Sequence, residues 1–225
     1  MNSSVRSPAR QLWAALRALL ALTLVCGVLY PLAVTGVAQA LMPGRAGGSE
    51  ITADGEVVGS ALIGQRYDLP AEEGGKSAAP DLRWFQPRPS HGLGTNTLNT
   101  RYALLVSGAT NLSGDNADLI DRVTAAKAAV VRDNSVPGHP VEPADVPADA
   151  VTSSGSGLDP DISPEYAHLQ VRRVAARNHL AAGRVAELVE RHIDGRVLGF
   201  IGEPRVNVLR LNLALRQLVG GAVTR

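Results

Sequence analysis

The first strong pattern along the chain is a long apolar run near the N-terminus. Residues 18–42 contain no charged side chain over twenty-five consecutive positions. At ~1.5 Å per residue, a helix of this length reaches about 37 Å, which is enough to cross a hydrocarbon core of roughly 30 Å with some tilt. The pattern therefore predicts a transmembrane helix over residues 18–42.

Shorter and mixed patterns follow it. The pair Asp54-Gly55 between two apolar runs predicts a β-hairpin over residues 51–63. Apolar positions at helical spacing predict a helix over residues 116–134. Ser163 followed by Pro164 marks the start of another helix, because serine caps a helix well and proline fits its first turn. We expect Gly183 to end that helix.

The remaining segments complete a mixed α/β domain over residues 43–225. We expect a further helix to end at Gly195, a strand over residues 197–200, and either a strand or a helix over residues 206–218. Residues 70–81 are expected to form a polar surface loop and the proline-rich residues 135–150 an extended connection. Residues 151–160, which we call the Ser/Gly loop, form a tight turn rich in serine and glycine.

Charges on either side of the apolar run predict its orientation. Arg6, Arg10 and Arg17 precede it and only Arg45 follows closely. By the positive-inside rule, residues 1–17 are cytoplasmic and residues 43–225 extracytoplasmic. The alternative is a cleaved signal peptide, since residues 38–40 (AQA) fit a cleavage pattern. The run is much longer than the apolar part of a signal peptide, which favours a retained anchor.

Several residues of the apolar run predict that it packs against other helices. Pro31 removes one backbone donor, so we expect a kink there. Thr23 and Gly27 share one helix face, and Gly36 and Ala40 lie four residues apart. Small residues allow helices to approach closely in lipid. We therefore expect packing at Thr23, Gly27, Pro31, Gly36 and Ala40.

Composition narrows the possible functions. Hydrophobic residues make up 45% and charged residues 19%, which is typical of a folded chain. Residues 43–225 carry 19 basic and 21 acidic side chains, a net charge of −2, which argues against nucleic-acid binding. The single cysteine, Cys26, excludes an intramolecular disulfide and a cysteine-rich zinc site.

No catalytic motif is complete. Residues 75–77 (GKS) resemble the end of a phosphate-binding loop, but Pro70 stands where its first glycine belongs. The Ser/Gly loop lacks the first glycine of a nucleophile elbow, because Ser154 occupies that position. The five histidines, at positions 91, 139, 168, 179 and 192, show no metal-ligand pair. We predict no catalytic, cofactor-binding or metal-binding residue.

Two polar segments keep alternative interpretations. Asp159 and Asp161 beside the Ser/Gly loop could hold a cation, although such a sequence is more often a turn that precedes a helix cap. Glu203 and Arg205 could form a charge pair at an active site or an interface, or belong to a surface turn.

Blocks of residues along nearly the whole chain add a resemblance. They include residues 27–32 (GVLYPL), 88–90 (RPS), 154–160 (SGSGLDP) and 202–209 (GEPRVNVL). Together these blocks resemble the C subunit of the Kdp potassium-transporting ATPase of bacteria. The chain departs from the family at Ala109 and Thr110, where Gly and Ser are usual, and at Asp161, where His is common. The first departure weakens any nucleotide-binding signature around residues 107–111.

The resemblance implies an accessory, non-catalytic subunit of an ATP-driven, high-affinity potassium uptake complex in the inner membrane. A channel-like subunit of that complex carries potassium, and a P-type ATPase subunit hydrolyses ATP through an aspartyl phosphate. This chain lacks the Asp-Lys-Thr-Gly motif of the ATPase subunit. The family is described as a catalytic chaperone that raises ATP affinity. ATP is cytoplasmic, whereas most of this chain is expected outside the cytoplasm. Its effect on the ATP affinity of the ATPase subunit would therefore have to be transmitted through the complex.

With this resemblance, we interpret the two polar segments as a subunit interface. The expected interface residues are Ser154, Gly155, Ser156, Gly157, Asp159, Glu203, Arg205 and Asn207. Two other classes of function remain as alternatives: a membrane-anchored extracytoplasmic enzyme, in which Ser156 or Asp159 would be catalytic, and a secreted binding module.

Overall fold

The computed structural model describes residues 8–69, 79–90, 93–95, 103–105 and 107–223. The chain divides into two compact units, residues 1–50 and 51–225. The first unit is helical: α1 (Pro8–Leu24), the π-helical segment η1 (Val25–Leu29), α2 (Tyr30–Leu41) and the short α3 (Pro43–Ala46). The run Pro8–Leu41 spans 34 residues and contains an 18-residue window with a mean hydropathy of 2.1, none of which is buried. The predicted apolar helix is therefore present, and it begins ten residues before the charge-free run.

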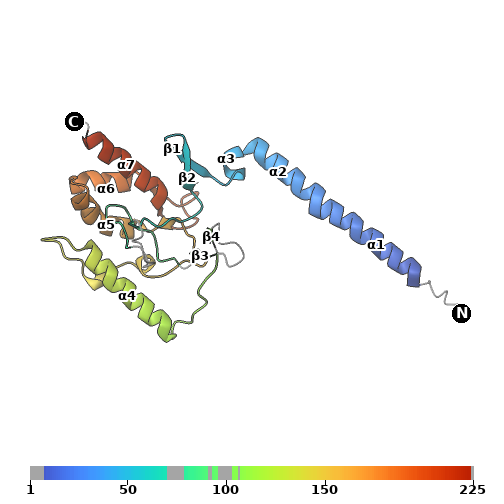
Figure 1. Cartoon of the computed structure of the whole chain (residues 1–225), viewed down its shortest axis with the longest axis horizontal. Coiled ribbons are helices and arrows are strands. Elements are labelled where there is room, and N and C mark those ends of the chain that lie inside the picture. The colour runs from blue at the N-terminus through green and yellow to red at the C-terminus, as the bar shows by residue number, and fades with distance from the viewer. Residues whose placement is uncertain (1–7, 70–78, 91–92, 96–102, 106, 224–225) are drawn as a thin grey trace. The chain divides into compact units, whose positions relative to one another are not determined.

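The π-helical segment lies immediately before Pro31, where we expected a kink. Proline cannot donate to the carbonyl four residues earlier, and a π turn relieves this by lengthening the local hydrogen-bond span. Tyr30 accordingly donates its amide to the carbonyl of Val25. The ribbon continues from α1 into α2 without a sharp bend (Figure 1), so the π turn takes the place of the predicted kink.

The second unit opens with the predicted hairpin. Strands β1 (Glu50–Ala53) and β2 (Glu56–Ser60) pair across a turn at Asp54 and Gly55, both at positive φ. A second antiparallel pair joins β3 (Leu93–Thr95) to β4 (Ala103–Leu105), with Gly94 opposite Leu104. An isolated antiparallel β-bridge between Asp68 and Pro80 flanks the segment predicted as a surface loop, of which residues 70–78 lie outside the described residues.

A small sheet and three helices form the centre of this unit (Figure 1). Helix α5 (Pro164–Arg177) packs against α6 (Ala182–Glu190), and α7 (Val208–Val223) packs against α6 and β7. The sheet has the order β5-β7-β6, all antiparallel, from Asp161–Ile162, Arg205–Asn207 and Ile193–Asp194. Helix α4 (Ala117–Asn134) contacts α5, and two 3-10 turns, η2 (Pro143–Asp145) and η3 (Ala148–Ala150), follow it.

Both predicted helix starts are confirmed. The side chain of Asn116 accepts from the amide of Leu119, and Ser163 accepts from the amide of Tyr166, with Pro164 in the first turn. The core lies between these helices and the sheet. Its fully buried apolar members are Phe85, Ala167, Val174, Val185, Val189, Val206, Leu211 and Leu215.

Four local expectations were wrong or incomplete. Gly183 does not end a helix but lies in the first turn of α6, and α5 ends earlier, before His179 at φ 56°. The next helix ends at Glu190, not at Gly195. Residues 197–200 form a turn rather than a strand, since Val197 pairs only with Ile201. Residues 206–218 contain both elements: β7 ends at Asn207 and α7 begins at the next residue. The connection over residues 135–150 is extended apart from a tight turn closed by a bridge between Val136 and His139 and its two 3-10 turns.

A buried arginine fixes the segment that leads to the site. Arg173 on α5 is 2% exposed, and burial lowers its pKa to about 10. Its guanidinium donates to four oxygens: the backbone carbonyls of Leu82 and Trp84 and the side chains of Asn134 and Gln170. A buried charge is costly unless hydrogen-bonded, and these acceptors hold residues 82–84 beside α5.

Side-chain amides continue the attachment toward residue 88. Gln170 accepts from the amide of Gln86 at 2.7 Å and donates to its carbonyl at 3.1 Å. Asn212 of α7 treats Phe85 in the same way. Residues 82–86 are therefore fixed between α5 and α7 by side chains, and this positions Arg88 two residues later.

Candidate interaction site

The Ser/Gly loop is a set of nested turns closed by its own serines. The hydroxyl of Ser154 accepts from the amide of Gly157 at 3.0 Å, and that of Ser156 accepts from Leu158 at 3.1 Å. Gly157 is buried at φ 68°, in the left-handed region that favours glycine. The two serine oxygens are 3.2 Å apart. Both hydroxyls thus build the turn.

Three distant segments attach to the backbone of this loop. The amide of Gly64 donates to the carbonyl of Leu158 at 2.7 Å. The amide of Gly108 donates to the carbonyl of Ser156 at 2.8 Å, and the hydroxyl of Ser90 donates to the carbonyl of Gly157. A Cβ on Gly64 would lie 2.6 Å from the Asp159 carbonyl oxygen, so only glycine fits there. The loop is therefore held from several sides.

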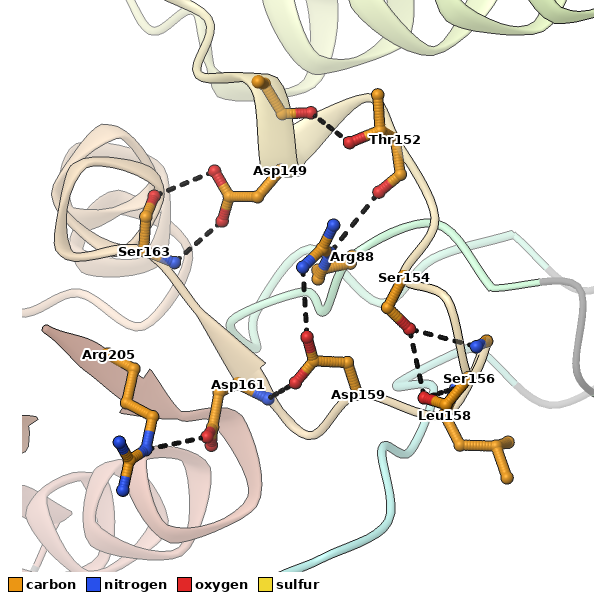
Figure 2. A network of polar contacts seen from close by, with 12 residues as sticks. Arg88, Asp149, Thr152, Ser154, Ser156, Leu158, Asp159, Asp161, Ser163 and Arg205 are labelled. Atoms are coloured by element: carbon orange, nitrogen blue, oxygen red, sulfur yellow. Dashed lines mark hydrogen bonds and ion pairs between the residues drawn. The ribbon is translucent and has the colours of Figure 1, made fainter. Parts of the chain in front are cut away.

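Arg88 and Asp159 form the central ion pair of the site (Figure 2). The Nη1 of Arg88 lies 3.0 Å from Oδ2 of Asp159, and its Nε donates to the carbonyl of Thr152 at 3.4 Å. The other carboxylate oxygen of Asp159 accepts from the amide of Asp161 at 3.0 Å. The ion pair is only partly exposed, so it is screened less than a surface pair. It joins both ends of the Ser/Gly loop.

Asp161 links the loop to the second predicted segment. Its carboxylate lies 3.1 Å from Nε of Arg205 and accepts from Nδ2 of Asn207 at 2.9 Å. The same Asn207 amide donates to the carbonyl of Ala61 at 3.0 Å. Burial raises the pKa of the Asp161 carboxyl above its usual value, and neighbouring Asp159 adds to the rise. The hydrogen bond from Asn207 and the charge of Arg205 oppose it.

Glu203 does not join this network. Its carboxylate pairs with Nη2 of Arg196 at 2.8 Å, whereas Arg205 pairs with Asp161. Of the two interpretations given to this segment, a direct Glu203–Arg205 charge pair is absent, because the two side chains take different partners. Glu203 still lines the groove that the network borders.

An open groove of about 570 Å³ lies beside these residues. Asp149 closes one side, where its two carboxylate oxygens accept from the amide and the hydroxyl of Ser163 at 2.7 and 2.8 Å (Figure 2). That arrangement caps α5. The groove is lined by Arg88, Asp149, Asp159, Asp161, Ser163, Glu165, Glu203 and Arg205.

The chemistry of the site is that of hydrogen-bonded and ion-paired side chains. Among the described residues, no group of three or more His, Cys, Asp or Glu side chains could hold a metal ion. His168 pairs with Glu190 at 3.1 Å, and His192 contacts the carbonyl of Leu188 at 2.7 Å. Neither histidine belongs to the network around the Ser/Gly loop. His91 lies outside the described residues. The two serines, Ser154 and Ser156, bond to each other and to backbone amides of their own turn.

The structure brings most of the predicted interface residues together. Asp159, Arg205 and Asn207 join through Asp161, whereas Glu203 stands apart. Sequence reasoning did not include three residues that the structure places beside them: Arg88, Asp149 and Asp161. Arg88 and Asp159 are 71 residues apart, so no local pattern joins them. The signal available was the short motif of residues 88–90 (RPS) after the aromatic residues Trp84 and Phe85.

The predicted packing positions lie in the first unit. Thr23 precedes the π-helical segment, Gly27 lies within it, and Pro31, Gly36 and Ala40 follow in α2. A Cβ on Gly27 would touch Cγ2 of Thr23 at 3.9 Å, so these two do share a face. Nothing lies within 4 Å of a Cβ built on Gly36. Their packing against other helices stays a prediction.

Comparison with known proteins identifies the family. The family described as "K+-transporting ATPase, c chain" (KdpC) matches residues 12–217. A potassium-transporting ATPase KdpC subunit of Streptomyces avermitilis is 68% identical over 219 residues, 97% of this chain and 99% of that protein. The Streptomyces coelicolor protein of the same name is 69% identical, covering 97% of each chain. One from Allorhizobium ampelinum is 49% identical over 85% of this chain and 87% of its own. The chain therefore belongs to the KdpC family, the c chain of the K+-transporting ATPase.

Proposed function

We propose that this chain is an accessory, non-catalytic subunit that assembles and stabilises an ATP-driven potassium uptake complex. Its partners are a P-type ATPase subunit and a channel-like subunit. The Ser/Gly loop docks on the channel-like subunit. The observation that carries this is the loop's construction: it is fixed from several distant segments while Gly155 and Ser156 remain exposed. A surface fixed before binding loses little conformational entropy when a partner docks.

The proposal includes a single-pass topology in the inner membrane. Residues 1–17 are cytoplasmic, and the second unit is extracytoplasmic, because Arg6, Arg10 and Arg17 precede the charge-free run of residues 18–42. Any rise in the ATP affinity of the ATPase subunit then acts by coupling through the membrane helix and the assembled complex. ATP and potassium are handled by the other subunits.

Removing the loop's ion pair tests the docking role. Asp159→Ala leaves Arg88 without its carboxylate, and Arg205→Ala leaves Asp161 without its cation. Both variants should lower the yield of the purified complex and potassium-stimulated ATP hydrolysis in the same proportion. Asp121→Ala, at an exposed position on α4, is the matched control and should change neither.

The enzyme alternative makes a different prediction for the same variants. If the Asp159→Ala complex assembles with normal yield and thermal stability yet loses all turnover, docking is wrong and the loop takes part in chemistry. Ser156→Ala separates the cases further, because a nucleophile cannot be replaced by alanine, whereas a turn hydroxyl can be lost with a partial effect.

Topology has its own measurement. Alkaline phosphatase fused after Arg225 keeps the second unit whole and should be active in the cell, since that enzyme matures only outside the cytoplasm. A fluorescent protein that folds only in the cytoplasm should be dark at the same position. The opposite pair of results would place the second unit in the cytoplasm and allow direct contact with ATP.

A further inference from the structure

The connection between β6 and β7 presents a cluster of exposed apolar side chains. Residues 197–201 (VLGFI), which we call the apolar turn, connect these two strands. Leu198 is 80% exposed and Phe200 is 73% exposed. The only other phenylalanine, Phe85, is completely buried in the core. Four large apolar side chains in one turn form a patch that soluble surfaces normally avoid.

The apolar turn is well built. Val197 and Ile201 exchange both backbone hydrogen bonds, at 2.9 and 3.0 Å. Leu198 and Gly199 take positive φ values of 55° and 82°, which close the chain tightly. The ion pair between Arg196 and Glu203 lies at the base of the turn, at 2.8 Å. Its side chains are thus held out from the domain by a fixed backbone.

Four of the five backbone amides of the turn are hydrogen-bonded within it or to the residue just before it. The amides of Val197, Gly199, Phe200 and Ile201 all donate to carbonyls of residues 196–201. In a hydrocarbon environment every unpaired backbone group is costly, so only internally bonded segments enter it. In water this internal pairing is of much smaller value. The turn therefore exposes few free amides, and its remaining backbone groups suit the interfacial layer of a bilayer, where water and headgroups can bond them, rather than the hydrocarbon core.

The small size of the patch favours lipid over a protein as the partner of the apolar turn. A stable protein interface involves about 20–30 residues on each side. Here charged residues border the four apolar side chains: Asp194 and Arg196 before them, Glu203 and Arg205 after them. An apolar tip bounded by charges matches shallow insertion at a bilayer surface, where the charges stay in the headgroup layer.

The apolar helix of the same chain keeps the second unit close to a membrane. Residues 42–49 connect α2 to β1, and eight residues reach at most about 30 Å even when fully extended. The second unit is therefore confined near the bilayer that holds its own apolar helix. Confinement of this kind raises the effective concentration of the second contact, so even a small apolar tip can bind.

The geometry points to the apolar turn as a second membrane contact of this chain, in which Leu198, Phe200 and their neighbours insert into the interfacial layer of the lipid bilayer. The inference is independent of which side of the membrane the second unit occupies, and it adds a lipid contact to the proposed subunit interface.

Fluorescent probes on the full chain test this inference. In a Cys26→Ser background, Leu198→Cys carries an environment-sensitive nitrobenzoxadiazole label, and the protein is reconstituted alone into phosphatidylcholine vesicles. Ala128→Cys, at an exposed position on α4, is the matched control. Doxyl-labelled lipid should quench the probe at 198 about threefold more than the probe at 128, with a blue-shifted emission at 198 only.

A second labelled position, and reconstitution together with the other subunits, complete the test. Phe200→Cys repeats the measurement, so a local disturbance by one label does not decide the result. If both turn probes remain water-exposed and unquenched in vesicles, the inference is wrong. If they become shielded only after the other subunits are co-reconstituted, the turn binds protein rather than lipid, and the inference also fails.

Discussion

The side-chain amide of Asn212 makes both backbone hydrogen bonds of Phe85, a residue 127 positions earlier. Phe85 donates its amide to Oδ1 at 2.9 Å, and Nδ2 donates to the Phe85 carbonyl at 2.9 Å. The exchange imitates the pairing of two residues in neighbouring antiparallel strands. A side chain of helix α7 thus pairs with the backbone of Phe85 as a neighbouring strand would. This pairing allows residues 82–86 to pass through the core without a strand beside them.

Replacing Asn212 by alanine should destabilise the second unit strongly. The change leaves a buried amide and a buried carbonyl unpaired, which costs about 3 kcal/mol of unfolding free energy. Chemical denaturation of the purified full chain measures this. Gln217→Ala, exposed on the same helix α7, is the control and should change the unfolding free energy by less than about 0.5 kcal/mol. Equal effects of the two variants would show that the hydrogen bonds of Asn212 to Phe85 do not stabilise the second unit.

Two glycines near the Ser/Gly loop should respond differently to alanine. Gly64→Ala places a methyl group 2.6 Å from the backbone oxygen of Asp159, so the loop must move, at a cost of roughly 2 kcal/mol or more. Gly155→Ala meets no atom within 4 Å and should leave stability nearly unchanged. Thermal unfolding compares the two. An unchanged melting temperature for Gly64→Ala would show that the close approach is not maintained in solution.

The acidic limb of the stability profile should carry the signature of Asp161. Its pKa is raised above 3.8, chiefly by burial, with Asp159 and Asp194 adding to the rise and Asn207 and Arg205 opposing it. The folded state therefore keeps a proton that the unfolded chain has lost, and stability falls as pH rises from about 3.8 through the folded pKa. Relative to the native chain, Asp161→Asn should gain stability across that window.

Asp81 supplies a comparison of opposite sign. Hydrogen bonds from Arg83 lower the pKa of its carboxyl, so its contribution is present above pH 3.8 and is lost as pH falls through the folded pKa. Asp81→Asn should therefore lose stability relative to the native chain above that pH. Denaturation measured between pH 3 and 7 checks both variants, and trends of the same sign would contradict the assignment of the two carboxyls.

The predicted packing of the apolar helix against other subunits can be tested by adding a bulky side chain to one face of α2. Gly36→Leu should weaken co-purification with the other subunits, because the larger side chain prevents close helix approach. Nothing within the chain lies near a Cβ at Gly36, so the isolated protein should be unaffected. Ala38→Leu adds bulk on the opposite side of α2 and serves as the control. Undiminished co-purification and potassium-limited growth for Gly36→Leu would indicate that this face meets lipid.

Local signals predicted the parts of the fold that local chemistry determines. The apolar run, the Asp54-Gly55 hairpin and the caps at Asn116 and Ser163 depend on neighbouring residues, and all are present. Gly183 was misread because glycine is the usual residue at a helix end. Here His179 takes the left-handed conformation instead, and Gly183 falls within the next helix.

Long-range features were out of reach of the sequence. Strands β5 and β6 have two residues each, too short for an alternating pattern, and β5 pairs with a strand, β7, that lies far along the chain. The Ser/Gly loop was visible as a turn, but its ion pair to Arg88 joins segments 71 residues apart. Packing decides such contacts, and no periodicity in the sequence records them.

The order β5-β7-β6 has a consequence for how the protein is made. The central strand, β7, is the last of the three to be synthesised: Asn207 follows its register partner in β5, Asp161, by 46 residues. At about 5–20 residues per second, the ribosome leaves β5 without its neighbour for roughly 2–9 s. During that interval the apolar faces of α5 and α6 lack Val206, Leu211 and Leu215. The nascent chain is therefore a client for chaperones until α7 emerges, and a premature stop before residue 205 should mark the product for degradation.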